Sequence, residues 1–294
     1  MIRFEADAQG LATLTWDTPG NRQNVINGEN CAALSGAVER CAQDSAVKGI
    51  VLTSAKPDFI VGADLQWLLA PEGARQLWER TMAMHRVLRR LETCGKPVAA
   101  ALPGSALGAG LEIALAAHYR VAADKPLARL GLPEVTLGLV PAGGGTQRLA
   151  RLIGIQAALP LLLEGRRVAT KEALDLGLLN AVVPAGSEVQ AARSWLLAQT
   201  APARQPWDAK GLSIPGGAVA SPAVQQLFML SNALLRARTL AQAPANILSC
   251  VYEGLITDID TGLKTEASYF VHTLLGAGAK SMIRSLFASM AEGT

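Results

Sequence analysis

Two glutamates, Glu112 and Glu134, lie in segments that are otherwise apolar. Glu112 is part of the run LEIALAA, and Glu134 follows Pro133 and precedes an apolar, glycine-bearing run that ends at Pro141. A carboxylate in apolar surroundings is costly unless it is paired or used in chemistry. The two groups could meet across a site and share acid and base work. In the structural alternative, Glu112 pairs with a core arginine such as Arg148 and Glu134 caps an element, and the residues alone leave both interpretations open.

Three glycines, Gly104, Gly108 and Gly110, precede Glu112 at the start of a predicted helix. Glycine lets the backbone approach a ligand closely, and the first N–H groups of a helix are unpaired donors at its positive end. Such an end suits an oxyanion or a bound anion. The alternative is that these glycines only let a helix pack tightly on a strand. A dinucleotide fingerprint does not fit, because Ile113 stands where its third glycine would be.

A Gly-Ala-Asp turn lies in the segment FIVGADL, residues 59–65, after a predicted strand at 50–53. The turn offers a free backbone N–H at Ala63 and a helix cap from Asp64. A second N–H donor near Ala63 would complete an oxyanion hole. Taken alone, a turn of this kind is more often ordinary helix capping.

The elements that must position these residues alternate between strand and helix in the first part of the chain. Short β-rich runs at 11–15, 47–53, 98–102 and 119–122 are separated by helical patterns at 31–42, 78–91 and 109–117. This rhythm predicts an α/β fold with largely buried strands. After residue 184 the patterns are helical, at 187–197, 222–239, 245–255, 268–275 and 280–290. We therefore predict an α/β core over residues 1–188 and a helical C-terminal segment over 189–294, with a Pro- and Gly-rich loop at 201–217.

Composition excludes several classes of protein. Half of the 294 residues are hydrophobic, which is enough for a sizeable core and excludes a disordered chain. The 27 basic and 24 acidic residues form no long tract of like charge, so we expect no nucleic-acid partner. The apolar stretch 97–117 contains Glu112, whose charge would cost roughly 2.5–3.5 kcal/mol in a bilayer, so we expect no membrane span. Four scattered cysteines without a CxxC pair argue against a zinc site and for a cytoplasmic protein.

Four segments in order give the chain a family resemblance. FIVGADL, GSALGAGLEIAL, GLPEVTLGLVPAGGGTQRL and ATKEALDLGLLNAVVP together resemble the enoyl-CoA hydratase/isomerase (crotonase) family, over about residues 8–186. PWDAKGLSIPGG and ILSCVYEGL are similar to the segment that follows the hydratase part of multifunctional fatty-acid β-oxidation proteins. The resemblance implies a crotonase-like spiral of ββα units followed by a helical segment. In the multifunctional relatives that segment precedes a 3-hydroxyacyl-CoA dehydrogenase module.

The resemblance also implies roles for individual residues. The N–H groups of Ala63 and Ala109 would hold the thioester carbonyl, Glu112 would deprotonate the attacking water, and Glu134 would give a proton to the α-carbon. It implies no metal and no cofactor, since CoA is part of the substrate. The family most often has Gly where Ala109 stands, and the spacing between the glutamates is slightly longer here, with Asp124-Lys125-Pro126 as the extra turn. The further substrate-binding residues implied are Gly62, Asp64, Leu65, Gly108, Gly110, Pro133, Pro141 and Gly143.

Because both glutamates are present, the implied activity is hydration of trans-2-enoyl-CoA thioesters in fatty-acid β-oxidation. Three alternatives stay open: Δ3–Δ2-enoyl-CoA isomerisation, a CoA-ester-binding fragment with little activity, and a mainly structural role. The expected partners are an acyl-CoA thioester and a second copy of the chain, or a thiolase subunit and a dehydrogenase domain. We expect His118 to serve in packing or capping and Trp207 to be an apolar anchor. Apolar faces of the helical segment are expected to lie partly uncovered and to favour self-association, namely at Phe228, Leu234, Ile247, Val251, Phe270 and Phe287.

Overall fold

The computed structural model describes residues 2–70, 73–238 and 241–292, and the side chains of these residues except 238 and 287–292. The chain forms two compact units that alternate along the sequence. The first unit comprises residues 1–64, 84–131 and 167–212, and the second comprises 65–83, 132–166 and 213–294. The predicted boundary at residue 188 separates two consecutive domains. Because the two units alternate along the sequence, they do not correspond to those domains, and the boundary stays a prediction.

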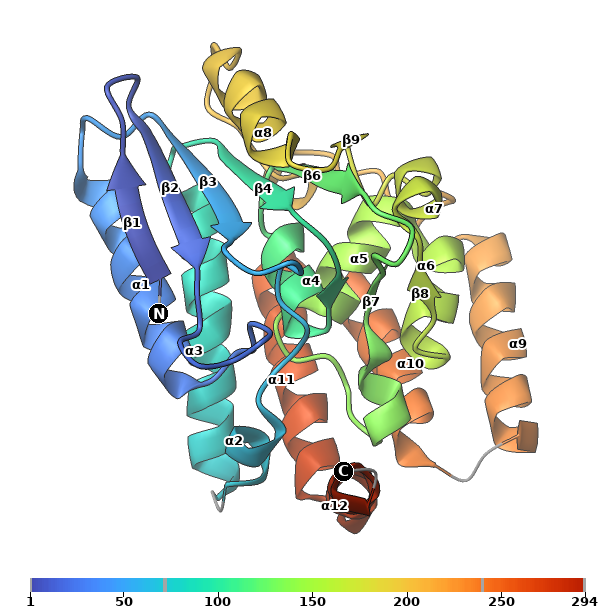
Figure 1. Cartoon of the computed structure of the whole chain (residues 1–294). Coiled ribbons are helices and arrows are strands. Elements are labelled where there is room, and N and C mark those ends of the chain that lie inside the picture. The colour runs from blue at the N-terminus through green and yellow to red at the C-terminus, as the bar shows by residue number, and fades with distance from the viewer. Residues whose placement is uncertain (1, 71–72, 239–240, 293–294) are drawn as a thin grey trace. The chain divides into compact units, whose positions relative to one another are not determined.

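A six-stranded sheet organises the first unit (Figure 1). Its spatial order is β1-β2-β3-β4-β6-β9; β1 and β2 are antiparallel, and every other neighbouring pair is parallel. All five residues of β4 are buried, as expected for a parallel strand covered on both faces. The strands span Ile2–Ala6 (β1), Leu11–Trp16 (β2), Gly49–Ser54 (β3), Val98–Leu102 (β4), Tyr119–Asp124 (β6) and Ala181–Pro184 (β9).

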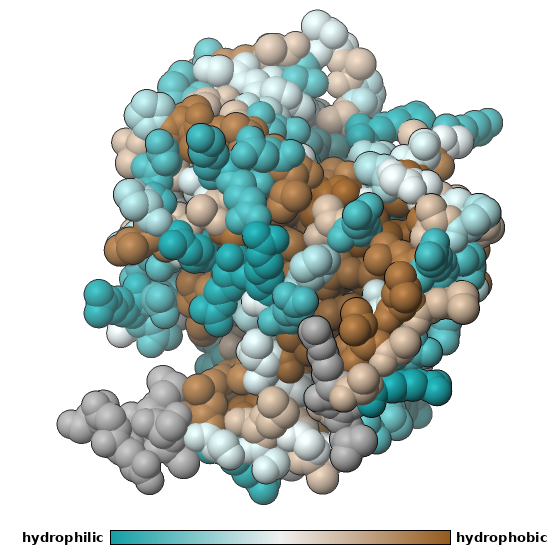
Figure 2. Space-filling view, turned by 90° about the vertical axis from the view of Figure 1, so that its right-hand side faces the viewer, coloured by the Kyte–Doolittle hydropathy of each residue, from teal (hydrophilic) through white to brown (hydrophobic). Residues whose placement is uncertain are grey.

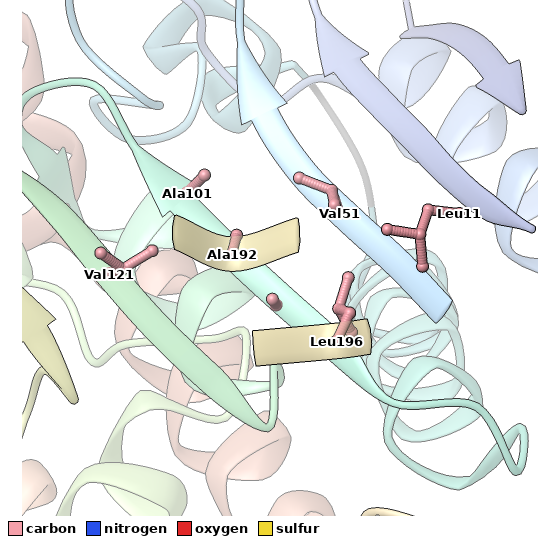
Figure 3. Close-up of a cluster of buried hydrophobic side chains, with 7 residues drawn as sticks. Leu11, Val51, Ala101, Val121, Ala192 and Leu196 are labelled. Carbon is pink, nitrogen blue, oxygen red and sulfur yellow. The ribbon is translucent and has the colours of Figure 1, made fainter. Parts of the chain in front are cut away.

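Helix α8 (Glu188–Leu197) packs on one face of this sheet. Figure 3 shows the contact, in which Ala192 and Leu196 of α8 meet inward side chains of four strands. Successive side chains of a strand point to opposite faces of the sheet, so only every second residue of a strand, such as Ala99 and Ala101 of β4, can reach this cluster. The strand residues in the cluster are Leu11, Val51, Ala99, Ala101 and Val121.

A second, three-stranded sheet in the first unit carries the glycine-rich segment. Strand β5 (Ala106–Leu107) pairs in parallel with β7 (Leu130–Gly131), and β7 pairs antiparallel with β8 (Arg167–Val168). Helix α4 (Ala109–Leu115) starts directly after β5. The remaining helices of the first unit are α1 (Gly28–Gln43), α7 (Thr170–Asp175) and the 3₁₀ helix η2 (Pro206–Asp208), together with the C-terminal part of α3 (Ala74–Thr93).

The second unit is helical throughout its described residues. It contains α2 (Leu65–Leu69), the start of α3, the 3₁₀ helix η1 (Pro133–Leu137), α5 (Gly145–Ile153) and α6 (Ile155–Leu163). It also contains α9 (Pro222–Arg238), α10 (Gln242–Leu255), α11 (Ile259–Leu275) and α12 (Ala277–Glu292). The prediction of an α/β fold with a helical C-terminal region is confirmed.

The prediction of uncovered apolar faces on the C-terminal helices is largely wrong. Helices α10 and α11 pack against each other and bury Ile247, Val251 and Phe270. Phe228 of α9 is buried as well, whereas Leu234 is 52% exposed, and the side chain of Phe287 lies outside the described residues. The helices therefore cover most of each other's apolar surface within the second unit.

Helix α9 keeps an exposed apolar stripe on the side away from Phe228. Met229, Leu230 and Leu234 are 72%, 56% and 52% exposed, at positions that share a helix face. Figure 2 views the molecule from the side on which Figure 1 shows α9, and apolar side chains gather there in a broad patch. Among the described residues, no helix is both long and apolar enough to cross a membrane.

Candidate active site

The Gly-Ala-Asp turn runs alongside the glycine-rich segment in the first unit. Ile60 forms a parallel bridge with Ala106, and the N–H of Leu107 donates to the carbonyl of Ile60 at 3.0 Å. Ala63 and Ala109 each lie three residues beyond this bridge on their own segments. The bridge therefore places the two predicted donors on adjacent segments, each three residues beyond the point where the segments pair.

The N–H groups of Ala63 and Ala109 are available to a ligand. On either side of Ala63, the carbonyl of Gly62 accepts from Ile26 and the N–H of Asp64 donates to Ile26, at 2.9 and 2.8 Å. The N–H of Ala63 thus points away from Ile26, and no described group accepts it. Ala109 is the first residue of α4, where a backbone N–H has no acceptor within its own helix. Two free backbone donors on adjacent segments are the elements from which an oxyanion hole can be formed.

Asn24 holds the turn segment in place, and sequence reasoning missed it. Its side-chain amide donates to the carbonyls of Trp16 and Phe59 and to the Ser54 hydroxyl, at 3.1, 3.2 and 2.9 Å. Its own carbonyl accepts from the N–H of Val61 at 3.0 Å. The one available signal is an asparagine in a polar loop, and such asparagines are too common to single this one out.

Two glycines make the close approach possible. Gly108 has φ 53° and ψ −127°, a left-handed backbone that favours glycine, and its N–H donates to Gly131 at 2.9 Å. A Cβ on Gly110 would lie 2.1 Å from the carbonyl oxygen of Ile60. Ala109 needs no such freedom, because no residue other than glycine has a positive φ among the described residues. An alanine at this position therefore keeps the helical N–H in place.

Glu112 is 2% exposed and lies in the first turn of α4. Its backbone N–H donates to the carbonyl of Gly108 at 3.0 Å, so the carboxylate is carried by the same turn that presents the Ala109 N–H. The positive end of a helix favours a negative charge at this position. Glu112 is thus a buried carboxylate one helical turn from a free backbone donor.

Glu134 belongs to the second unit, within the 3₁₀ helix η1, and is partly exposed. Gly138, with φ 69°, ends this helix, and the N–H of Leu139 donates to the Glu134 carbonyl at 3.0 Å. Of the predicted site residues, the first unit brings together Gly62, Ala63, Asp64, Gly108, Ala109, Gly110 and Glu112. Those in the second unit are Leu65, Pro133, Glu134, Pro141 and Gly143.

A buried carboxylate, Glu266, fixes the start of helix α5 just after Gly143. Its two oxygens accept from the N–H groups of Gly144 and Thr146 at 2.5 and 2.9 Å, and Oε2 also accepts from the Thr146 hydroxyl at 2.5 Å. Glu266 therefore serves as the cap of a helix 120 residues away in sequence. Glu266 was not selected from the sequence, and the helix predicted at 268–275 began after it. Its helical spacing from Leu263 and Phe270 is the available signal, and that spacing does not identify its partners.

His118, Trp207 and the cysteines have structural surroundings. Nδ1 of His118 accepts from the N–H of Val98 at 3.1 Å, and Nε2 lies 3.2 Å from the Glu92 carbonyl, which confirms a packing and capping role. Trp207 is 8% exposed, as an apolar anchor should be. Burial raises the pKa of Cys41 to about 11, which makes it a poor nucleophile. The described residues contain no cluster of side chains that could hold a metal ion.

Residues 6–207 match the family described as "Enoyl-CoA hydratase/isomerase". Among curated proteins, the chain is similar to the fatty acid oxidation complex subunit alpha of Shewanella amazonensis, with 37% identity over 290 residues. The same subunit of Shewanella loihica is 37% identical over 288 residues. Both alignments cover 96% of this chain and 40% of the relative, so the chain spans well under half the length of these curated relatives.

Solved structures share the fold. The enoyl-CoA hydratase/isomerase of Pseudoalteromonas atlantica superposes with a TM-score of 0.70 at 23% identity, covering 98% of this chain and 97% of that one. An enoyl-CoA hydratase/carnithine racemase of Magnetospirillum magneticum is 29% identical with a TM-score of 0.61, over 68% of this chain and 75% of that one. The first of these spans both the α/β core and the C-terminal helices, so its likeness covers nearly the whole chain.

Proposed function

Because this chain belongs to the enoyl-CoA hydratase/isomerase family, we propose that it adds water across the C2=C3 bond of trans-2-enoyl-CoA thioesters. The observation that supports the proposal is that the bridged segments of Ile60 and Ala106 carry the free backbone donors Ala63 and Ala109, with Glu112 on the same helical turn as the second donor. Two backbone donors suit a carbonyl oxygen whose negative charge grows during the reaction.

In this proposal the thioester oxygen accepts from the N–H groups of Ala63 and Ala109, which draws electrons from the double bond and makes C3 electrophilic. Glu112 takes a proton from water as the water oxygen attacks C3, and the negative charge passes to the thioester oxygen. Glu134 then gives a proton to C2. Loss of one donor from such a hole typically costs about 2.7–4 kcal/mol of transition-state stabilisation. No cofactor is needed, since the CoA is part of the substrate.

The name of the curated relatives supports a role in fatty-acid oxidation. We propose that the chain performs the hydration step of β-oxidation in the cytoplasm. The proposed assembly partners are a dehydrogenase domain and a thiolase subunit, and a homo-oligomer is the alternative assembly. Turnover of a substrate series, from crotonyl-CoA to longer 2-enoyl-CoA esters, would define the acyl chain length that the enzyme prefers.

The test is loss of the ultraviolet absorbance of crotonyl-CoA with the purified chain and its Glu112→Gln and Glu134→Gln variants. Removal of a general acid or base typically costs about 10²–10⁴-fold in rate, and we expect each variant to lose that much. Glu164→Gln, at an exposed position of the second unit, is the matched control and should keep full activity.

Other results point to the alternatives. Full hydration by Glu112→Gln would exclude this residue as the base. Turnover of a 3-enoyl-CoA that needs only Glu134, without hydration of the 2-enoyl ester, would identify an isomerase. Binding of CoA esters without any turnover by the parent chain, across the length series, would identify a binding protein.

A further inference from the structure

Strand β1 forms one outer edge of the six-stranded sheet, and among the described strands only β2 pairs with it. Figure 1 shows β1 at this edge with no strand beyond it. Helix α1 covers one face of the strand, where the guanidinium carbon of Arg40 lies 3.7 Å from the centre of the Phe4 ring. An open edge of this kind offers unpaired backbone N–H and C=O groups to another strand.

The hairpin between β1 and β2 determines which backbone groups face this edge. At the end of the hairpin the N–H of Asp7 donates to the carbonyl of Leu11 at 3.2 Å, so these two residues form a hydrogen-bonded pair. Hydrogen-bonded and non-hydrogen-bonded pairs alternate along an antiparallel ladder. Arg3 and Glu5 therefore direct their backbone groups to β2. The residues that direct their backbone groups to the open edge are Ile2, Phe4 and Ala6.

Arg3 and Glu5 carry opposite charges on the same face of β1, because they are two residues apart on a strand. The Arg3 side chain is 56% exposed, and Glu5 is exposed as well. Arg3 lies 3.9 Å from Asp17, which Lys56 contacts more closely, at 3.0 Å. Glu5 forms no ion pair within the described part of the chain. Both charges are thus accessible to an added strand.

A second copy of the chain is complementary to this edge. We propose that two copies pair β1 with β1 in antiparallel orientation about a two-fold axis at Phe4, so that the sheet continues through the dimer. Phe4 then lies opposite the partner's Phe4, and Ile2 lies opposite the partner's Ala6. These outward-facing residues exchange backbone hydrogen bonds. In the same register, each Arg3 lies opposite the partner's Glu5.

Charge distinguishes this register from its neighbours. Only every second residue faces the edge, so the alternative antiparallel registers differ by steps of two residues. The next register in one direction places Arg3 opposite the partner's Arg3, and the next in the other direction places Glu5 opposite the partner's Glu5. Opposite charges that face each other across two strands stabilise a sheet, and like charges destabilise it. The proposal does not depend on the hydratase activity.

The test is sedimentation velocity of the full chain at low salt, over a series from about 1 μM to 1 mM. We expect the parent to form a dimer within this range. Arg3→Glu and Glu5→Arg each place like charges opposite one another in both cross-strand pairs, so each should weaken self-association by at least about tenfold. The double variant Arg3→Glu/Glu5→Arg exchanges the two charges and should dimerise like the parent.

A mixture of the two single variants tests the register directly. In a mixed dimer the two acidic side chains of one variant face the two basic side chains of the other. An equimolar mixture should therefore dimerise, although each variant alone associates weakly. Lys171→Glu, a charge reversal at an exposed position of the same unit, is the matched control and should dimerise like the parent. Circular dichroism of each variant checks that it is folded.

A further variant, Ala6→Pro, tests the backbone pairing. The N–H of Ala6 faces the open edge, so proline removes no hydrogen bond to β2 and deletes one donor from the dimer. We expect the folded variant to associate at least about tenfold more weakly than the parent. A parent that stays monomeric throughout the series would overturn the proposal. Unchanged association of Arg3→Glu, or single variants that fail to dimerise when mixed, would overturn it as well.

Discussion

Thr146 gives both its backbone N–H and its hydroxyl to the same oxygen of Glu266, at 2.9 and 2.5 Å. The other oxygen accepts from Gly144, so a single carboxylate from α11 holds the whole start of α5. Glu266 is fully buried, which means that water cannot take its place. The turn from Gly144 to Thr146, directly after the predicted site residue Gly143, is therefore fixed by a residue far along the chain.

Replacement of Glu266 by leucine leaves the N–H groups of Gly144 and Thr146 buried without an acceptor. We expect Glu266→Leu to lower the free energy of unfolding by about 2–5 kcal/mol, because unsatisfied buried donors cost about 1–3 kcal/mol each. Urea unfolding followed by circular dichroism measures this change. Glu164→Gln, at an exposed position, should change it by less than about 0.5 kcal/mol. Equal stability of the two variants would contradict the capping role.

The contact between Gly110 and Ile60 gives a prediction about activity. A Cβ at residue 110 would lie 2.1 Å from the Ile60 oxygen and 2.7 Å from its carbonyl carbon, so the two segments must separate. Ala63 and Ala109 lie on these segments, and we expect Gly110→Ala to reduce hydration of crotonyl-CoA by at least about 100-fold. Gly36→Ala is the control, because nothing lies within 4 Å of a Cβ there. The idea fails if Gly110→Ala turns over at the parental rate.

Arg89 of helix α3 binds the 3₁₀ helix η2 (Pro206–Asp208). It donates to both oxygens of Asp208, at 3.1 and 2.7 Å, and to Glu92 at 2.6 Å, while the Glu92 side chain is completely buried. Arg89→Met leaves that carboxylate without its guanidinium, and we expect a loss of about 3–5 kcal/mol in the free energy of unfolding.

Arg75→Met is the matched comparison for Arg89→Met. Arg75 and its partner Glu79 are 91% and 60% exposed, and exposed pairs contribute at most about 1 kcal/mol. Chemical denaturation of both variants gives the two values directly. A loss at Arg89 no greater than the loss at Arg75 would mean that the Arg89 contacts are not needed for stability.

His118 makes stability depend on pH. Burial lowers the pKa of His118 below its ordinary value of 6.5, although the charge of Glu92 partly opposes this. The acceptor role of Nδ1 toward Val98 also needs the neutral ring. The unfolded chain therefore binds the proton more readily, so this stability is complete above pH 6.5 and is lost as pH falls through the lowered pKa.

The pH effect is measured as the free energy of unfolding at pH 7.0 and 5.5, for the parent and for His118→Gln. We expect the parent to lose more stability between these values than the variant does. Parallel losses in both proteins would assign the pH dependence to other groups.

The hydrophobic pattern predicted the elements that carry the first half of the site. The expected strand at 98–102 coincides with β4, and the helix expected at 109–117 is α4, Ala109–Leu115. Runs of this kind are visible because the strands are buried on both faces and the helix is apolar apart from Glu112. Strands β5, β7 and β8 have two residues each and escaped prediction, since two residues show no period.

The contacts that hold the site could not be predicted in the same way. Asn24 contacts Phe59, and Glu266 contacts Thr146, across 35 and 120 residues of sequence. Hydrophobic periodicity predicts which face of a helix is buried. It does not predict which backbone group a buried side chain will contact. On α9 the exposure of Leu234 was expected, whereas Met229 and Leu230 were missed and Phe228 was wrongly expected to be uncovered, because an apolar residue at a helical interval has no mark that separates the inner face from the outer one.

In the proposed mechanism, the paired donors at Ala63 and Ala109 also bear on how such a protein changes over generations. Both are main-chain amides, and every amino acid except proline supplies one. Drift at either position can therefore alter size and polarity around the bound carbonyl without deleting the group that polarises it. Mutations can therefore replace the carboxylates and the side chains that line the site, while the backbone N–H groups that polarise the carbonyl are kept. A scaffold of this kind can acquire new reactions by exchanging a few side chains around an unchanged grip on the thioester.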